Sequence, residues 1–264
     1  MLEWRYIENS SGSAAWNMSV DEALLRSCKE DDRPILRLYQ WEEPALSLGR
    51  FSDPKKTLNW EKIETNNIPC TRRITGGGIL VHGGDISYSL IVPRSFLKNR
   101  SIKKGYRYLC SFLLSFYHNL GLDASFACDQ HFTEKYSNVC LAGTEAYDIV
   151  INSRKIGGNA QRHTRQTILQ HGTVPLTLAR EYFETLFLEN SGLTEAATLE
   201  DLGIDMGYHA CAQSLKEAFR DAFDATLHDE GLHKDELSLA QTLLNDKYTR
   251  EAWNVHAKDT SKQA

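Results

Sequence analysis

Hydrophobic and polar positions alternate along several short stretches of this chain, and such alternation predicts half-buried β-strands. The stretches are residues 4–8, 34–41, 45–49, 86–92 and 168–176. Residues 45–49 are expected to return as the partner of 34–41. Residues 79–82 are expected to form an antiparallel hairpin with 86–92. The pattern therefore predicts several strands joined mostly by hairpins.

Other stretches have apolar residues at helical spacing. Residues 17–25 predict a helix with Asp21 and Glu22 in its first turn. Residues 59–65 predict a short helix, and Ser101 is placed to cap a long one that ends near residue 120. Beyond residue 178 the pattern is helical, most clearly at 215–223 and 237–244. We expect an α+β (α/β) fold with a mainly antiparallel or mixed sheet. Residues 1–177 would form the core, and 178–264 a helical extension packed on the same unit.

Composition narrows the functional classes. The chain has 264 residues, 41% of them hydrophobic and 25% charged, which is ordinary for a globular protein. A net charge of −5 disfavours non-specific nucleic-acid binding. No apolar run is long enough to span a bilayer, and the start lacks the basic and apolar segments of a secretory signal. We therefore expect a cytoplasmic protein without membrane or nucleic-acid partners.

The cysteines predict thiols and no metal centre. The six residues are Cys28, Cys70, Cys110, Cys128, Cys140 and Cys211. None forms a Cys-x-x-Cys pair, and no Cys/His cluster has the spacing of zinc ligands. Free thiols are the expected state in a reducing cytoplasm.

A glycine-rich turn carries the first candidate chemistry. Arg72 and Arg73 precede Thr75, the glycines Gly76, Gly77 and Gly78 follow, and His82 comes shortly after. Glycines let a backbone turn sharply and approach a ligand closely. Exposed amides beside two cations suit an anionic or carbonyl-bearing ligand. His82 could accept a proton near neutral pH.

A second candidate region lies between residues 147 and 176. Two short strands are predicted about a turn at 152–154, and Lys155 follows that turn. The small residues Gly158, Asn159 and Ala160 come next, and a later strand holds His171, Gly172 and Thr173. Small side chains beside a lysine leave room for a linear ligand along the sheet. His171, like His82, is a candidate proton acceptor.

These blocks, in this order, resemble the lipoate-protein ligase A / octanoyltransferase superfamily, which shares the biotin/lipoate protein ligase catalytic domain. The resemblance rests on the glycine turn with its two arginines and His82, on residues 154–160, and on residues 171–173. Residues 17–24, 44–49, 247–248 and 253–254 are also similar, so it covers nearly the whole chain. The Gly-Arg-Gly-Arg type of loop found in biotin ligases is not present in the sequence.

The resemblance implies a site and a reaction. The glycine turn and Lys155 would enclose an octanoyl or lipoyl chain, with Lys155 on the acyl carbonyl. The product would be an amide on a lysine of a lipoyl domain, in a 2-oxoacid dehydrogenase or the glycine cleavage H protein. The implied substrate-binding residues are Arg72, Arg73, Gly76, Gly77, Gly78, His82, Gly158, Asn159, Ala160, His171, Gly172 and Thr173.

Three interpretations of the acyl donor remain open. Cys140 resembles the nucleophile of single-domain, cysteine-dependent octanoyltransferases, which take the chain from octanoyl-acyl carrier protein as a thioester and need no cofactor. Gly78 is the ligase-like form of the loop, and an ATP-dependent ligase would use ATP and Mg, with Arg72 and Arg73 facing the adenylate phosphate. An amidotransferase acting between lipoyl proteins would use the same cysteine. A non-catalytic binder is disfavoured because Lys155 and the glycines are retained.

Overall fold

The computed structural model describes residues 1–130, 138–139 and 145–259. Its largest sheet has six strands in the order β10, β11, β6, β2, β1 and β12. Their bounds are Gly158–His163, Thr167–Pro175, Asp85–Pro93, Ile35–Tyr39, Leu2–Glu8 and Ala225–Asp229. Neighbours from β10 to β2 are antiparallel, whereas β1 is parallel to both β2 and β12. The predicted α+β fold with a mixed sheet is confirmed.

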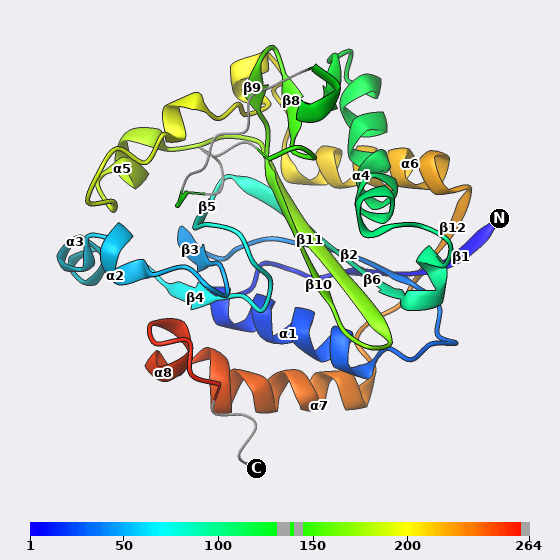
Figure 1. Ribbon diagram of the computed structural model, residues 1–264, viewed down its shortest axis with the longest axis horizontal. Helices are drawn as coiled ribbons and strands as arrows, with labels where there is room; N and C mark the ends of the chain where they lie inside the picture. Colours follow the sequence, from blue (N-terminus) through cyan, green and yellow to red (C-terminus); the bar gives the residue numbers. More distant parts are fainter. Residues whose placement is uncertain (131–137, 140–144, 260–264) are drawn as a thin grey trace.

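Helices cover both faces of this large sheet (Figure 1). Helices α1 (Ala14–Ser27) and α7 (Lys234–Leu243) pack together on one face. Helices α4 (Ile102–Asn119) and α6 (Tyr208–Phe223) pack together on the other. Strand β6 shows why both faces need cover: Tyr88 and Leu90 belong to the core under α4 and α6, and Ile91 to the core under α1 and α7.

Two three-stranded sheets flank the large one. One holds β4 (Cys70–Arg72), β3 (Ala45–Leu48) and β5 (Leu80–His82). The other holds β7 (Ala124–Phe126), β8 (Ile149–Ile151) and β9 (Arg154–Lys155). Three short helices lie beside the first of these sheets (Figure 1): α2 (Pro54–Thr57), α3 (Trp60–Thr65) and α5 (Arg180–Glu184).

Several predicted elements are confirmed at their ends. The side chain of Ser101 caps α4 by accepting the amide of Lys104 at 3.3 Å, and that of Asn59 caps α3. Helix α1, however, begins at Ala14, so Asp21 and Glu22 lie in its middle rather than in its first turn. Both side chains are buried there, so these carboxylates are not surface acids that stabilise the helix dipole.

Two predicted hairpins are wrong. Strand β3 does not pair with β2 but lies between β4 and β5, and β5 does not pair with β6. The step between β5 and β6 is made by Gly83 and Gly84, with Gly83 at φ +137°. A conformation open to glycine lets the chain leave one sheet and enter another within two residues.

The C-terminal part is not wholly helical, which corrects the prediction for residues 178–264. Asp224 ends α6 in the left-handed conformation, and the chain then adds β12 to the edge of the large sheet. A π-helical turn, Leu244–Tyr248, and α8 (Glu251–Asn254) complete this part of the chain. None of the described helices is long and apolar enough to cross a membrane.

Candidate active site

Polar side chains form two rows across the face of the large sheet that α1 covers. Strand register places Arg37, Ser89 and His171 opposite one another on β2, β6 and β11. The next row holds Tyr39, Ser87 and Thr173, and on β10 the rows end at Ala160 and Gly158. These polar positions stand in the buried part of the sheet, where apolar residues would be expected if packing were their only role.

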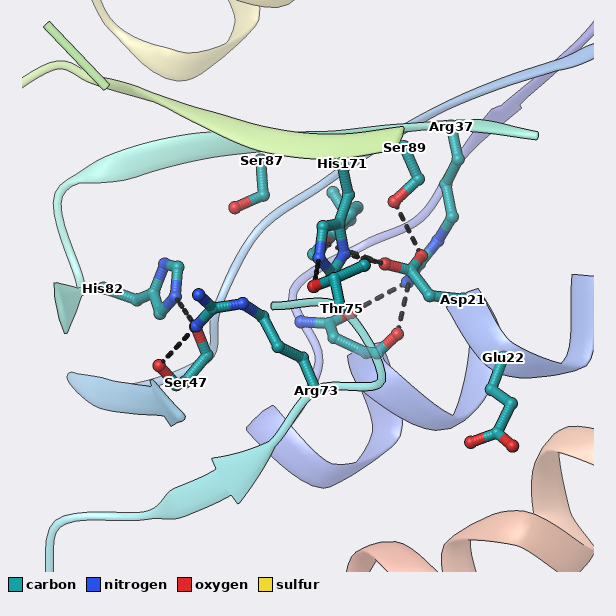
Figure 2. A network of polar contacts seen from close by, with 12 residues as sticks. Asp21, Glu22, Arg37, Ser47, Arg73, Thr75, His82, Ser87, Ser89 and His171 are labelled. Atoms are coloured by element: carbon teal, nitrogen blue, oxygen red, sulfur yellow. Dashed lines mark hydrogen bonds and ion pairs between the residues drawn. The ribbon is translucent and has the colours of Figure 1, made fainter. Parts of the chain in front are cut away.

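Asp21 of α1 reaches this face and joins its polar groups (Figure 2). Its Oδ1 accepts from Nη1 of Arg37 at 2.6 Å and from the Ser89 hydroxyl at 2.8 Å. Its Oδ2 lies 2.9 Å from Nδ1 of His171. Burial alone would raise the pKa of Asp21, but the Arg37 charge and these hydrogen bonds bring it below its usual value. Asp21 is therefore a buried carboxylate that stays ionised.

Arg37 is fixed as firmly as the acid it pairs with. It is fully buried, and its guanidinium also donates to the side chains of Asn17 at 2.8 Å and Asn9 at 2.7 Å. The ring of Tyr39 lies 4.0 Å from the guanidinium carbon. A buried ion pair needs its remaining donors satisfied, and these contacts satisfy those of Arg37. Arg37 is thereby fixed in position, and it in turn fixes the Asp21 carboxylate.

His171 connects Asp21 to the glycine-rich turn. Its Nε2 lies 2.6 Å from the Thr75 hydroxyl, on the opposite side of the ring from Asp21. Burial lowers the pKa of His171, and the nearby Arg73 and His82 lower it further, against the raising effect of Asp21. The neutral ring then has one possible arrangement. Nδ1 carries the hydrogen donated to Asp21, and Nε2 accepts the hydrogen of Thr75.

His82, on β5, has a similar arrangement beside the second row. Its Nδ1 lies 3.0 Å from Asp85, and its Nε2 lies 2.8 Å from the Ser47 hydroxyl. Asp85 also accepts from Thr173 at 2.5 Å and from Ser87 at 3.0 Å. The indole of Trp41 stacks on the His82 ring at 3.7 Å, which fixes the plane of the ring.

Arg73 holds the glycine-rich turn in shape. Its Nη2 donates to the carbonyls of Gly76 and Gly78, and its Nη1 to the carbonyl of Ser47 at 2.7 Å. A Cβ on Gly49 would lie 1.8 Å from the Gly77 carbonyl oxygen, so the turn passes directly over residue 49. Within the part of the chain that the structure describes, a Cβ on Gly76 would meet nothing within 4 Å. The turn is therefore packed on one side and open at Gly76.

Arg72 has a different environment. It is fully buried, and its guanidinium donates to backbone carbonyls of two segments that are remote in sequence. These carbonyls belong to Gly49, Arg50, Ser52, Trp253, Asn254 and Val255. Arg72 thus joins the loop after β3 to α8 and its end. Its predicted contact with substrate stays a prediction.

Lys155 forms a buried ion pair at the end of β9. Its Nζ lies 2.6 Å from Asp148, and both side chains are 6% exposed. The turn before it has Asn152 and Ser153 at positive φ. After it, Gly157, at φ +71°, packs against the carbonyl of Thr173, and Gly158 pairs with Thr173 in the sheet. The Lys155 segment therefore leads, three residues later, to Gly158 at the β10 end of the second row.

Cys140 lies outside the described residues, but the residues just before it do not. The amide of Ile79 donates to the carbonyl of Asn138 at 2.8 Å, and Ile79 bridges Val139 in parallel. The five cysteines that are described are free thiols. Burial raises the pKa of Cys28, Cys70 and Cys211 to about 12 and that of Cys110 further, and it also raises that of Cys128.

The structure brings together most, but not all, of the residues expected from the sequence. His82, His171, Thr173, Gly158, Ala160 and the glycine-rich turn meet on the α1 face. The side chain of Asn159 points the other way and accepts from the Tyr88 hydroxyl at 2.7 Å, while Gly172 packs against it. Sequence reasoning missed Asp21, Asp85, Asp148 and Ser47 as site residues. The Ser87-x-Ser89 spacing in an apolar strand is the signal that could have marked this face as polar.

The fold and the site together define an enzyme class. Two carboxylate–histidine–hydroxyl arrangements beside a glycine-rich turn, with a buried lysine nearby, are suited to proton transfer and to binding a carbonyl. No cluster of three potential metal ligands is found among the described residues. The overall architecture is that of lipoate-protein ligases. A lipoate-protein ligase A structure bound with ATP has a TM-score of 0.84 at 24% identity, with 97% of this chain and 100% of that one covered.

Sequence comparison gives the family. Residues 13–220 match the lipoyl protein ligase A/B catalytic domain. A protein of Bacillus subtilis (strain 168) named octanoyltransferase LipM is 31% identical, over 95% of this chain and 97% of its own length. The protein of the same name from Kyrpidia tusciae is 31% identical over 96% of this chain and 99% of its length. This chain belongs to the lipoyl protein ligase A/B catalytic domain family.

A further solved structure is a bipartite lipoate protein ligase with its E2 lipoyl domain, from Thermoplasma acidophilum. It has a TM-score of 0.83 at 22% identity and covers 97% of this chain and 98% of that one. Its likeness concerns the fold. The sequence relatives therefore carry more weight for the reaction.

Proposed function

We propose that this protein transfers an octanoyl group from octanoyl-acyl carrier protein to a lysine of a lipoyl domain, through a thioester on Cys140. Lys155 polarises the acyl carbonyl, and the acceptor lysine then displaces the cysteine. The full-length relatives named octanoyltransferase LipM support this reaction. The acceptors would be lipoyl domains of 2-oxoacid dehydrogenases or the glycine cleavage H protein, and the reaction needs no cofactor.

One observation carries the proposal. The chain immediately before Cys140 is hydrogen bonded to the glycine-rich turn, through the Ile79 amide and the Asn138 carbonyl. Val139, the residue directly before Cys140 in the sequence, is thus paired with the end of the glycine-rich turn. The described cysteines are poor alternatives, since a thiol with a raised pKa supplies little thiolate at neutral pH.

Lys155 suits the role that the reaction requires. An ammonium beside the acyl carbonyl stabilises the negative charge that develops on its oxygen as a nucleophile adds. Asp148 gives the buried Lys155 a counter-charge by pairing with it at 2.6 Å. The same pair limits where the Lys155 side chain can lie, so the charge is oriented before substrate binds.

The ATP-dependent ligase is the alternative, and the two arginines argue against it. That reading needs Arg72 and Arg73 to face an adenylate phosphate. Instead, Arg72 donates to six backbone carbonyls, and Arg73 donates to carbonyls of Ser47, Gly76 and Gly78. Redirecting either guanidinium to a phosphate would leave buried carbonyls without their donors.

The test is the intact mass of the protein after incubation with octanoyl-acyl carrier protein without ATP. We expect an octanoyl adduct on the wild type and none on Cys140→Ala, and we expect the adduct to discharge onto an added lipoyl domain. Cys128→Ala, which removes a described cysteine, serves as the control and should load like the wild type. If no adduct forms, and Cys140→Ala modifies the lipoyl domain when given lipoate and ATP, the ligase reading replaces this one. The amidotransferase is tested by offering an octanoylated lipoyl protein as the acyl donor in place of octanoyl-acyl carrier protein. Loading of Cys140 from that donor alone would identify it.

A further inference from the structure

The proposed reaction includes one step, deprotonation of the acceptor lysine, to which no residue has yet been assigned. The acceptor lysine is an ammonium at neutral pH, because its usual pKa is near 10.4, and an ammonium has no lone pair with which to attack a thioester. Some group must remove a proton from it inside the site. Lys155 is itself a cation paired with Asp148, so it is poorly suited to that task.

The Asp21–His171–Thr75 chain has the polarity that this step needs. Asp21 is held as a carboxylate by Arg37 and Ser89, so it can only accept the hydrogen of His171 Nδ1. His171 Nε2 must therefore accept from Thr75, at 2.6 Å. The hydroxyl hydrogen of Thr75 points toward the histidine. No described residue donates a hydrogen bond to the Thr75 hydroxyl oxygen, so its lone pairs can accept a hydrogen from another donor.

Thr75 itself is fully buried, so a donor has to reach its hydroxyl past the glycines that follow it in the turn. Thr75 directly precedes Gly76, where a Cβ would meet no atom of the described residues within 4 Å, and the turn continues to Ile79 beside Val139. On the sheet side, His171 is opposite the small residue Ala160 of β10. The relay therefore ends at the open part of the glycine-rich turn, on the same turn that leads to the segment before Cys140.

We propose that Thr75, His171 and Asp21 form a proton relay that deprotonates the acceptor lysine, with Thr75 contacting the amine and His171 taking up the proton. This inference rests on the proposed function. The ammonium gives a proton to the Thr75 oxygen while the Thr75 hydrogen passes to His171 Nε2. The imidazolium that results is stabilised by the ionised Asp21.

The free amine attacks the thioester carbon, forming the N–C bond, and the oxyanion develops beside Lys155. Collapse breaks the C–S bond, the second amine proton passes to the leaving sulfur, and Cys140 returns as a thiol. The proton on His171 is released to solvent. One ammonium and one thioester thus give one amide, one thiol and one proton.

The second arrangement, Asp85–His82–Ser47, is a weaker candidate for this step. The Ser47 hydroxyl also lies 3.3 Å from Nη1 of Arg73, so its oxygen already has a cationic donor. Asp85 accepts hydrogen bonds from Thr173, Ser87 and the Gly83 amide, which ties it into the sheet and the β5–β6 turn. We therefore assign the relay to His171 rather than to His82.

The experiment separates the loading of Cys140 from transfer to the acceptor. Octanoyl-enzyme is formed from octanoyl-acyl carrier protein, and single-turnover transfer to a lipoyl domain is followed by mass between pH 6 and 9. For Thr75→Val and His171→Gln we expect transfer to fall by about 100-fold at pH 7, and at least tenfold more than loading. Transfer by these variants should rise about tenfold per pH unit, as the amine deprotonates in solution, whereas wild-type transfer levels off.

Three controls keep the test decisive. Thr75→Ser keeps the hydroxyl and should restore transfer to within a few fold of the wild type. His163→Gln removes a histidine at the far end of β10 and should keep the wild-type pH profile. Thermal unfolding of each variant checks that it is folded.

Several results would overturn the relay. They are wild-type transfer by folded Thr75→Val, an equal loss of loading and transfer, or an octanoyl adduct on Thr75, which would make it a nucleophile instead. If the wild type does not load but works from octanoate and ATP, the proposed function fails. The same comparison, run from the acyl-adenylate, then still decides the relay.

Discussion

The Nζ of Lys155 lies 2.6 Å from the carboxylate of Asp148, and both side chains are almost entirely removed from solvent. Asp148 precedes β8, and Lys155 ends β9, so a tight turn at Asn152 and Ser153 brings the pair together. This buried ion pair therefore limits where the Lys155 ammonium, proposed to polarise the acyl carbonyl, can lie.

Replacing Asp148 with Asn should impair both stability and catalysis. The change removes the carboxylate that pairs with the buried Lys155, and losing one partner of a buried pair costs about 3 kcal/mol. We expect the free energy of unfolding to fall by that order and octanoyl transfer to fall more than tenfold. Urea unfolding and single-turnover transfer measure the two effects. Asp129→Asn breaks an exposed pair with Arg107 and should cost less than about 1 kcal/mol. Equal effects of the two changes would contradict this role.

Replacing Gly49 with Ala should distort the glycine-rich turn. The added Cβ would stand 1.8 Å from the Gly77 oxygen, and backbone atoms cannot move aside as a flexible side chain can. We expect a loss of about 1–3 kcal/mol in unfolding free energy and a fall in transfer rate of at least tenfold. Gly231→Ala, where a Cβ meets no atom of the described chain within 4 Å, is the matched control and should leave activity unchanged. An active, fully stable Gly49→Ala protein would show that the turn does not need this close approach.

His171 should make the protein less stable as the solution becomes more acidic. Burial lowers its pKa in the folded state, whereas the unfolded chain has a pKa near 6.5. Below about pH 6.5 the unfolded state therefore binds a proton that the folded state resists, and stability falls. Asp21, with its lowered pKa, adds to the loss only below about pH 4. The urea midpoint of the wild type should thus drop between pH 7.5 and 5, and His171→Gln should reduce that drop.

The pKa of His163 is also lowered by burial, so His163→Gln is measured in parallel to account for its share. The comparison concerns the change of the midpoint with pH, since His171→Gln also removes two hydrogen bonds and lowers stability at every pH. A pH dependence unchanged by His171→Gln would mean that the pKa of His171 is the same in the folded and unfolded states, contrary to the lowered pKa expected here.

Local features of the fold were predictable, and non-local ones were not. Helix α4 follows from its apolar stripe and the Ser101 cap, because both are written in neighbouring residues. The partner of β3 does not follow from neighbours. All of its residues are buried, so alternation says nothing about which strands lie on either side.

The site shows the same division. The glycine-rich turn, Lys155 and His171 stood out because their residue types are unusual in apolar stretches. Asp21 resembled an ordinary helix acid, and only the position of α1 over β2, β6 and β11 shows that it meets Arg37 and His171. The sequence likewise gives no reason to single out Asp148 or Asp85, since a carboxylate in a loop or at the start of a strand is usually solvated. Strand register, which sequence patterns do not give, decides these contacts.

The pairing of β12 with β1 has a consequence for how the molecule is made. Leu2 of the first strand is opposite Ala225, so the outermost strand beside β1 is supplied by residues more than 200 positions later. During synthesis from the N-terminus, β1 must wait as an exposed edge until that late segment emerges. Contacts of such sequence separation also slow folding. The nascent chain is therefore most vulnerable to wrong strand pairing just before its last quarter is complete.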